Sequence, residues 1–193
     1  MNILIDALPD FVTVDGVKYG VLTDFRIWME FDRIMHQREV CAKDKIMMII
    51  KLCLDGERCS ILPEDAMDTM DALCDFYLCG KESKGKSSGK RERVLDFSED
   101  SAYIYSAFLT QYGIDLLSIP YMHWYAFCAL LDGLENEREI IKIMGFRRCR
   151  PEQEKNAEKR KYLKRMKAIY ALPDSRSERD REEEIADTLF EVF

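Results

Sequence analysis

The side chains best suited to bind a metal ion or to act as nucleophiles are seven cysteines and two histidines in a chain of 193 residues. A zinc site needs ligands paired about two to four residues apart, because a tight turn must aim both at one ion. The chain has no Cys-x-x-Cys, and His36 and His123 are far apart. Cys74 and Cys79 would point to different faces of a helix. We therefore expect reduced thiols that mostly face the core, with no metal and no cofactor.

Catalytic motifs are also missing from the sequence. It contains no Gly-x-Ser-x-Gly, no Gly-x-Gly-x-x-Gly and no Gly-x-x-x-x-Gly-Lys-Ser/Thr. Residues 84–89 have the residue types of a phosphate-binding loop without its spacing. His123 could pair with Cys128 or Asp132 for acid–base or nucleophilic chemistry, but its aromatic neighbours favour a hydrogen-bonded packing role. We expect no catalytic residues and no enzymatic activity.

A basic segment, residues 147–167, is the most marked charge feature, with ten bases and three acids. Apolar residues are interleaved with the bases, so a helix here would have one apolar and one basic face. Three interpretations stay open: a solvated face beside the acidic region 94–146, a site for a protein with an acidic surface, or a site for nucleic acid or a membrane surface. The chain's net charge of −7 weakens the last. The candidate partner-binding residues in this segment are Lys159, Arg160, Lys164 and Arg165.

Hydrophobic periodicity predicts a mainly α fold: a helical globular domain with a small N-terminal β-hairpin. Asp15-Gly16 lies between two strand-like runs, residues 11–14 and 17–22, and favours the positive φ angles of a tight turn. Apolar residues then recur at steps of three and four, as on amphipathic helices. The expected helices run from an N-cap at Thr23 to about Met35, from Lys43 to Leu54, from Pro63 to Gly80, from Ser98 to about Gly113, from Pro120 to Gly133, from Glu135 to Met144 and from Glu152 to Ala171.

The charge and composition divide the chain into an N-terminal lobe (1–80), a flexible basic loop (81–93), a C-terminal helical lobe (94–173) and a charged tail (174–193), within one domain overall. The tail could add a helix that carries Ile185, Leu189 and Phe190. No apolar run approaches the ~18 residues of a membrane span, and no signal-peptide pattern is present. We expect an intracellular protein in a reducing cytoplasm.

Several strings, in this order, resemble the bacteriophage gene-product-fifteen family over roughly residues 1–174. Tyr125 stands where that pattern would have a second Trp, and Phe146 where it would have Tyr. The tail after Asp174 lies outside the pattern. The matching strings are Leu8-Pro9-Asp10, Val14-Asp15-Gly16, Tyr19, Thr23–Trp28, Lys51-Leu52-Cys53, Phe76–Gly80, Asp96-Phe97, Asp100, Tyr103–Phe108, Gln111–Leu116, His123-Trp124, Phe127, Ala129-Leu130, Gly133-Leu134, Ile143-Met144, Lys167 and Tyr170–Pro173.

The resemblance implies a product of the tail-morphogenesis genes of long-tailed phages and prophages of Gram-positive bacteria, acting in the host cytoplasm. By analogy with gene order, it implies a non-enzymatic tail assembly chaperone or adaptor. Its partners would be the tape-measure protein, tail-tube subunits and, as a homo-oligomer, a second copy. A virion structural component, such as a head–tail or tail-completion protein, is the alternative, and a nucleic-acid-binding protein comes after it.

A chaperone of apolar helices would need an exposed apolar or Met-rich surface. Two regions could supply one, although such stripes are more often core. One is the Met47-Met48, Met67 and Met70 region, and the other is the aromatic helix from Tyr121 to Leu131, with Tyr121 and Trp124 as candidate partner-binding residues.

Overall fold

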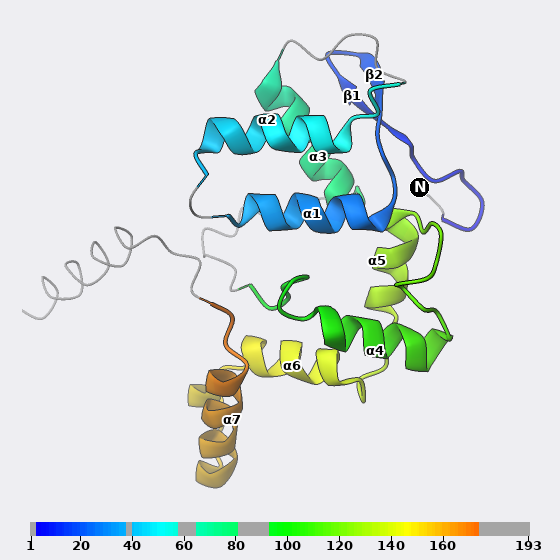
Figure 1. The fold of residues 1–193 in the computed structure, drawn as a ribbon. Coiled ribbons are helices and arrows are strands. Elements are labelled where there is room, and N and C mark those ends of the chain that lie inside the picture. The colour runs from blue at the N-terminus through cyan, green and yellow to red at the C-terminus, as the bar shows by residue number, and fades with distance from the viewer. Residues whose placement is uncertain (1–2, 38–39, 58–64, 81–92, 174–193) are drawn as a thin grey trace, which may run out of the picture.

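The computed structural model describes residues 3–37, 40–57, 65–80 and 93–173, and it confirms the mainly helical fold with an N-terminal hairpin (Figure 1). The predicted basic loop (except Arg93), Pro63, Cys59 and the predicted tail lie outside these residues. The elements are β1 (Phe11–Val14), β2 (Val17–Gly20), α1 (Phe25–Met35), α2 (Ala42–Cys53), α3 (Ala66–Tyr77), α4 (Ser101–Tyr112), α5 (Trp124–Asp132), α6 (Glu139–Arg148), a 3-10 turn (Pro151–Gln153) and α7 (Ala157–Ile169).

The hairpin forms as its turn residues predict. Asp15 and Gly16 have φ angles of 50° and 78°, which match the twist of a two-residue hairpin connection. The strands are antiparallel, and Val12 and Val14 face the core while Phe11 and Thr13 face outward. Val21 then pairs with Leu54, so the hairpin is fixed to the end of α2.

Helix α1 begins one residue later than predicted, because Asp24 and not Thr23 is its N-cap. The Asp24 carboxylate accepts the N–H of Arg26 at 2.9 Å. Thr23 instead forms a hydrogen bond of 2.7 Å with the hydroxyl of Tyr121. Helix α3 likewise has its cap at Asp65, whose side chain accepts two backbone N–H groups.

Helices α5 and α6 correct two predicted boundaries. Residues before α5 pair with the start of α1, as the Phe25 N–H donates to the carbonyl of Met122 and the Trp124 N–H to that of Thr23. The chain after Pro120 is therefore extended until His123 caps α5. Helix α6 begins at Glu139 and not at Glu135, because residues 135–138 form a turn held to α4, and it continues through Gly145 to Arg148.

The predicted basic helix is divided in two. Pro151–Gln153 form the 3-10 turn, and the side chain of Asn156 then caps α7 by accepting the N–H of Lys159. Helix α7 contacts this turn and α6, and no residue within α7 is buried. Figure 1 shows α7 projecting from the body of the molecule.

One aromatic core joins the two halves of the chain. Phe127 of α5 stacks on Phe25 of α1 and on Phe108 of α4, each with 5.0 Å between ring centroids. Trp124 stacks on Tyr77 at 5.3 Å, and its indole N–H donates to the carbonyl of Tyr77. The buried cluster thus includes residues from both predicted lobes. None of the described helices combines the length and apolar composition that a bilayer crossing requires.

Candidate functional site

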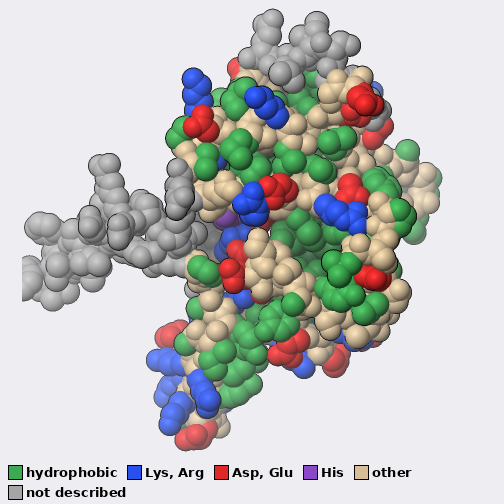
Figure 2. Space-filling model, viewed as in Figure 1, with side chains coloured by type: hydrophobic (Ala, Val, Ile, Leu, Met, Phe, Trp, Pro, Cys, Tyr) green, Lys and Arg blue, Asp and Glu red, His purple; other side chains and the backbone are tan. Residues whose placement is uncertain are grey.

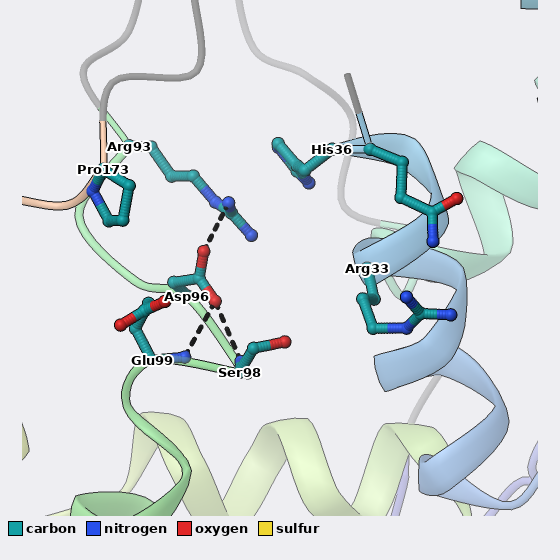
Figure 3. Close-up of a pocket in the computed structure, with 8 residues that line it drawn as sticks. Arg33, His36, Arg93, Asp96, Ser98, Glu99 and Pro173 are labelled. Carbon is teal, nitrogen blue, oxygen red and sulfur yellow. Dashed lines mark hydrogen bonds and ion pairs between the residues drawn. The ribbon is translucent and has the colours of Figure 1, made fainter. Parts of the chain in front are cut away.

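A polar cleft lies between the end of α1 and the segment that leads into α4 (Figure 3). Arg93 forms ion pairs with Asp32 at 2.5 Å and with Asp96 at 2.6 Å. Asp96 also accepts the backbone N–H groups of Ser98 and Glu99. The volume is about 230 Å³, and the lining residues are Arg33, His36, Gln37, Arg93, Asp96, Ser98, Glu99 and Pro173.

The cleft is better described as a contact between α1 and the segment before α4 than as a ligand site, and we call it the junction. Its volume is below the ~300–1,000 Å³ of small-molecule pockets, and its central arginine is already bound by two carboxylates. The Tyr77 hydroxyl donates to Asp32 at 2.8 Å, and burial, together with the negative charge of Asp32, raises the pKa of Tyr77. Within the described ranges, no group of three or more His, Cys, Asp or Glu residues could hold a metal ion.

A buried ion pair adjoins this junction and was not predicted from the sequence. Arg147 of α6 makes a bidentate pair with Asp100 at 2.6 and 2.9 Å, and these side chains are only 8% and 1% exposed. The same guanidinium donates to the carbonyls of Val94 and Tyr170. Arg147 is therefore not part of an exposed basic run but connects α6, the start of the second half and the end of α7.

His123 has the packing role that the sequence favours. Its Nδ1 accepts the N–H of Tyr125 at 3.0 Å, so its Nε2 carries the proton and donates to the carbonyl of Pro9 at 2.9 Å. Burial lowers the pKa of His123. Both ring nitrogens are thus bonded to the backbone, and the imidazole fixes the N-terminal segment to α5.

The four candidate basic residues of α7 fall into two pairs. Lys159 is exposed and forms an ion pair with Glu154 at 2.9 Å, while Arg160 is half-buried and donates to the carbonyl of Glu154. Lys164 and Arg165 are exposed, and within the described ranges neither takes part in an ion pair. The second pair is therefore available to a partner, whereas the first helps to hold the start of α7.

Apolar side chains accompany the exposed cations of α7. Tyr162 and Ile169 are 52% and 57% exposed. Figure 2 shows the resulting pattern on the projecting helix, with apolar side chains beside a basic edge. We call this surface the outer face of α7, and its exposed residues are Lys161, Tyr162, Lys164, Arg165, Ala168 and Ile169.

Helix α7 is attached to α6 along one border of its outer face. Tyr162, a member of that face, contacts the ring of Phe146 edge-on with 6.1 Å between centroids, and Tyr170, which follows α7, stacks on Phe146 at 5.9 Å. Lys167 donates to the carbonyl of Cys149 at 3.2 Å. These contacts position α7 on the end of α6 and leave the rest of the outer face, with about half of the Tyr162 side chain, exposed to solvent.

The two aromatic candidates, Tyr121 before α5 and Trp124 at its start, differ in exposure. Tyr121 is 52% exposed, and its hydroxyl bonds to Thr23. Trp124 is 2% exposed and belongs to the core, so it offers no surface to a partner in this conformation.

The methionine region supplies a second apolar surface. Met47 and Met48 on α2 and Met67 on α3 are 40%, 41% and 60% exposed, whereas Met70 is buried. Periodicity alone could not separate these residues, because α2 and α3 each have an exposed and a buried apolar edge.

Comparison with known proteins gives one family. A family model described as Bacteriophage Gp15 protein matches residues 4–172. No curated protein and no solved structure matches the chain. The match ends beyond α7 and includes every helix and strand described above.

Proposed function

Because the chain belongs to the Bacteriophage Gp15 protein family, we propose that it is a non-enzymatic tail assembly protein, a chaperone or adaptor that binds the tape-measure protein. A tape-measure protein is a long helical chain whose apolar stripes need cover before tail-tube subunits assemble around it. A protein that protects such stripes must offer apolar surface for a helix together with charge that keeps the complex in register.

The observation that carries this proposal is the outer face of α7. It combines two half-exposed apolar side chains, Tyr162 and Ile169, with the exposed cations Lys164 and Arg165. An amphipathic helix with acidic flanks would bury the apolar side chains and pair with the cations. The methionines of α2 and α3 would add adaptable apolar contacts, since the unbranched thioether fits many partner shapes.

Co-expression with the phage's tape-measure protein tests the proposal. We expect the tape-measure protein to be soluble only in the presence of this chain, and the two to co-purify. The variant Lys164→Glu/Arg165→Glu should lose co-purification while its thermal unfolding stays near that of the wild type. Lys18→Glu/Lys142→Glu is the matched control, because it makes the same charge change at exposed positions on the hairpin and α6, which belong neither to the outer face of α7 nor to the methionine region. Equal loss in both variants, or an insoluble tape-measure protein, would contradict the proposal.

Purified particles separate the chaperone from a virion component. A chaperone leaves before the tail is complete, so mature particles should contain none of this chain. Its presence at a fixed number of copies per particle would favour the head–tail or tail-completion alternative. Retention on DNA that falls steeply with salt would instead support binding of nucleic acid by α7.

A further inference from the structure

The tail that follows the described residues has the pattern of a partner for α7. Residues 182–193 contain five acids and no base. Ile185, Leu189, Val192 and Phe193 follow the i, i+4, i+7, i+8 spacing of one helix face. A helix of about 12 residues is marginal in water without tertiary contacts, so such a face requires a surface to pack against.

Helix α7 offers that surface with matching charge. Its 13 residues include six bases and one acid, a net charge of +5 against −5 for residues 182–193. Its outer face presents Tyr162 and Ile169 between exposed cations. If the two helices packed together, the apolar side chains of residues 182–193 would be buried against Tyr162 and Ile169. Acids of the tail would then lie beside Lys161 and Arg165 and pair with them.

Chain length and position also agree. Helix α7 is about 20 Å long and a 12-residue helix about 18 Å, so the two lengths match. Pro173 ends the described chain at the polar cleft, near the C-terminal end of α7. The eight residues 174–181 can span at most ~26 Å, enough for residues 182–193 to return along α7. A linker this short gives an effective concentration in the mM range, which favours docking within one chain over docking between copies.

We infer that residues 182–193 dock on the outer face of α7 of the same chain and cover it until a partner helix displaces them. The docking itself is independent of the proposed function, whereas displacement by a tape-measure helix rests on it. The tail and the partner helix would then bind the same surface in the same way, each through an apolar face with acidic residues on its flanks.

Amide hydrogen exchange of α7 in the full-length protein tests the docking. We expect Leu189→Ser to accelerate amide exchange of residues 157–169 about tenfold. This corresponds to a tenfold increase in the equilibrium constant for local opening of α7 when the docked tail is lost. Phe190→Ser is the matched control, since it removes a large apolar side chain that lies outside the i, i+4, i+7, i+8 face and should leave exchange unchanged. Equal exchange in wild type and Leu189→Ser would overturn the inference.

A charge-swap experiment tests the register and the origin of the partner. Lys161→Glu/Arg165→Glu should accelerate exchange of α7. Adding Asp187→Lys/Glu191→Lys should restore much of the protection, because a segment that returns antiparallel along α7 brings these two acids beside the two cations. A carboxyl–amine zero-length cross-linker should join Lys161 or Lys164 to the acids of residues 182–191. In a mixture of isotopically labelled and unlabelled protein, links within one isotope support docking in the same chain. Links between isotopes would overturn it in favour of a second copy.

The same variants distinguish this inference from the proposed function. If Leu189→Ser exposes α7 but does not strengthen tape-measure binding, the docking holds and the proposed use of α7 fails. If α7 exchange is insensitive to the tail while Lys164→Glu/Arg165→Glu abolishes tape-measure binding, the docking fails and the proposed function holds.

Discussion

Replacing Arg147 with methionine removes one end of the buried ion pair while it keeps most of the side-chain volume. The wild-type guanidinium makes two bonds to Asp100 and one each to the carbonyls of Val94 and Tyr170. In Arg147→Met the Asp100 carboxylate, 1% exposed, loses its compensating charge. Breaking a buried pair from one side costs about 3–5 kcal/mol, so we expect that loss in the free energy of unfolding.

Urea denaturation followed by circular dichroism measures this loss directly. For a chain of this size, 1 kcal/mol changes Tm by about 2–4 °C, which gives a decrease of roughly 6–20 °C for Arg147→Met. Arg33→Met is the control, because its pair with Glu30 is exposed and should contribute only about 0–1 kcal/mol.

The double variant Asp100→Asn/Arg147→Met completes the test. It removes both charges, so its cost should be well below the sum of the two single costs. A loss for Arg147→Met below about 1 kcal/mol, or strict additivity in the double variant, would refute the reasoning that this pair is buried and coupled.

Three further predictions follow from burial. Trp124→Ala should lower the free energy of unfolding by about 3–5 kcal/mol, the range for large core aromatics, whereas Tyr121→Ala should lower it by less than ~1 kcal/mol. If urea denaturation gave only a small decrease for Trp124→Ala, the ring would not be in the core. Burial lowers the pKa of His123 below 6.5, so the unfolded state binds more protons than the folded state, and the free energy of unfolding should fall as the pH drops through about 6.5. His123→Asn still offers an oxygen to cap α5, and its free energy of unfolding should depend less on pH. Parallel pH dependences of the wild type and the variant would contradict this. Burial also raises the pKa of Cys53, so iodoacetamide should modify exposed Cys41 well before it modifies Cys53, as peptide mass spectrometry would show.

Local sequence signals predicted the fold well where the structure is decided locally. Asp15-Gly16 specified the hairpin turn because few other residue pairs accept two positive φ angles, and Gly113 ended α4 with a φ of 67° for the same reason. The apolar periodicity of α1, α2 and α4 located each helix to within a few residues.

The errors arose where distant segments compete with local preference. Pro120 suits a first helical turn, but the chain that follows it pairs with residues 23–25. Helix α5 therefore begins only after its N-cap, His123. Gly145 resembles a helix stop, yet burial of Ile143 and Arg147 on either side continues α6 through it. No neighbouring residue in the sequence indicates that Arg147 meets Asp100, 47 positions earlier.

The candidate surface was found only in part. The basic spacing of residues 159–165 indicated the exposed side of α7, and Lys164 and Arg165 lie there. Sequence could not show that Lys159 is paired with Glu154 or that Trp124 is in the core, because both depend on how segments pack.

The attachment of α7 has a mechanical consequence. A pull on α7 away from the body would load the stack of Tyr170 on Phe146 and the bond from Arg147 to the carbonyl of Tyr170. The same guanidinium also donates hydrogen bonds to Asp100 and to the carbonyl of Val94. A force on the projecting helix would therefore act on the segment that begins the second half of the chain, residues 93–173. A force on α7 would therefore be transmitted through Arg147 to Asp100, which is among the most deeply buried residues of the fold.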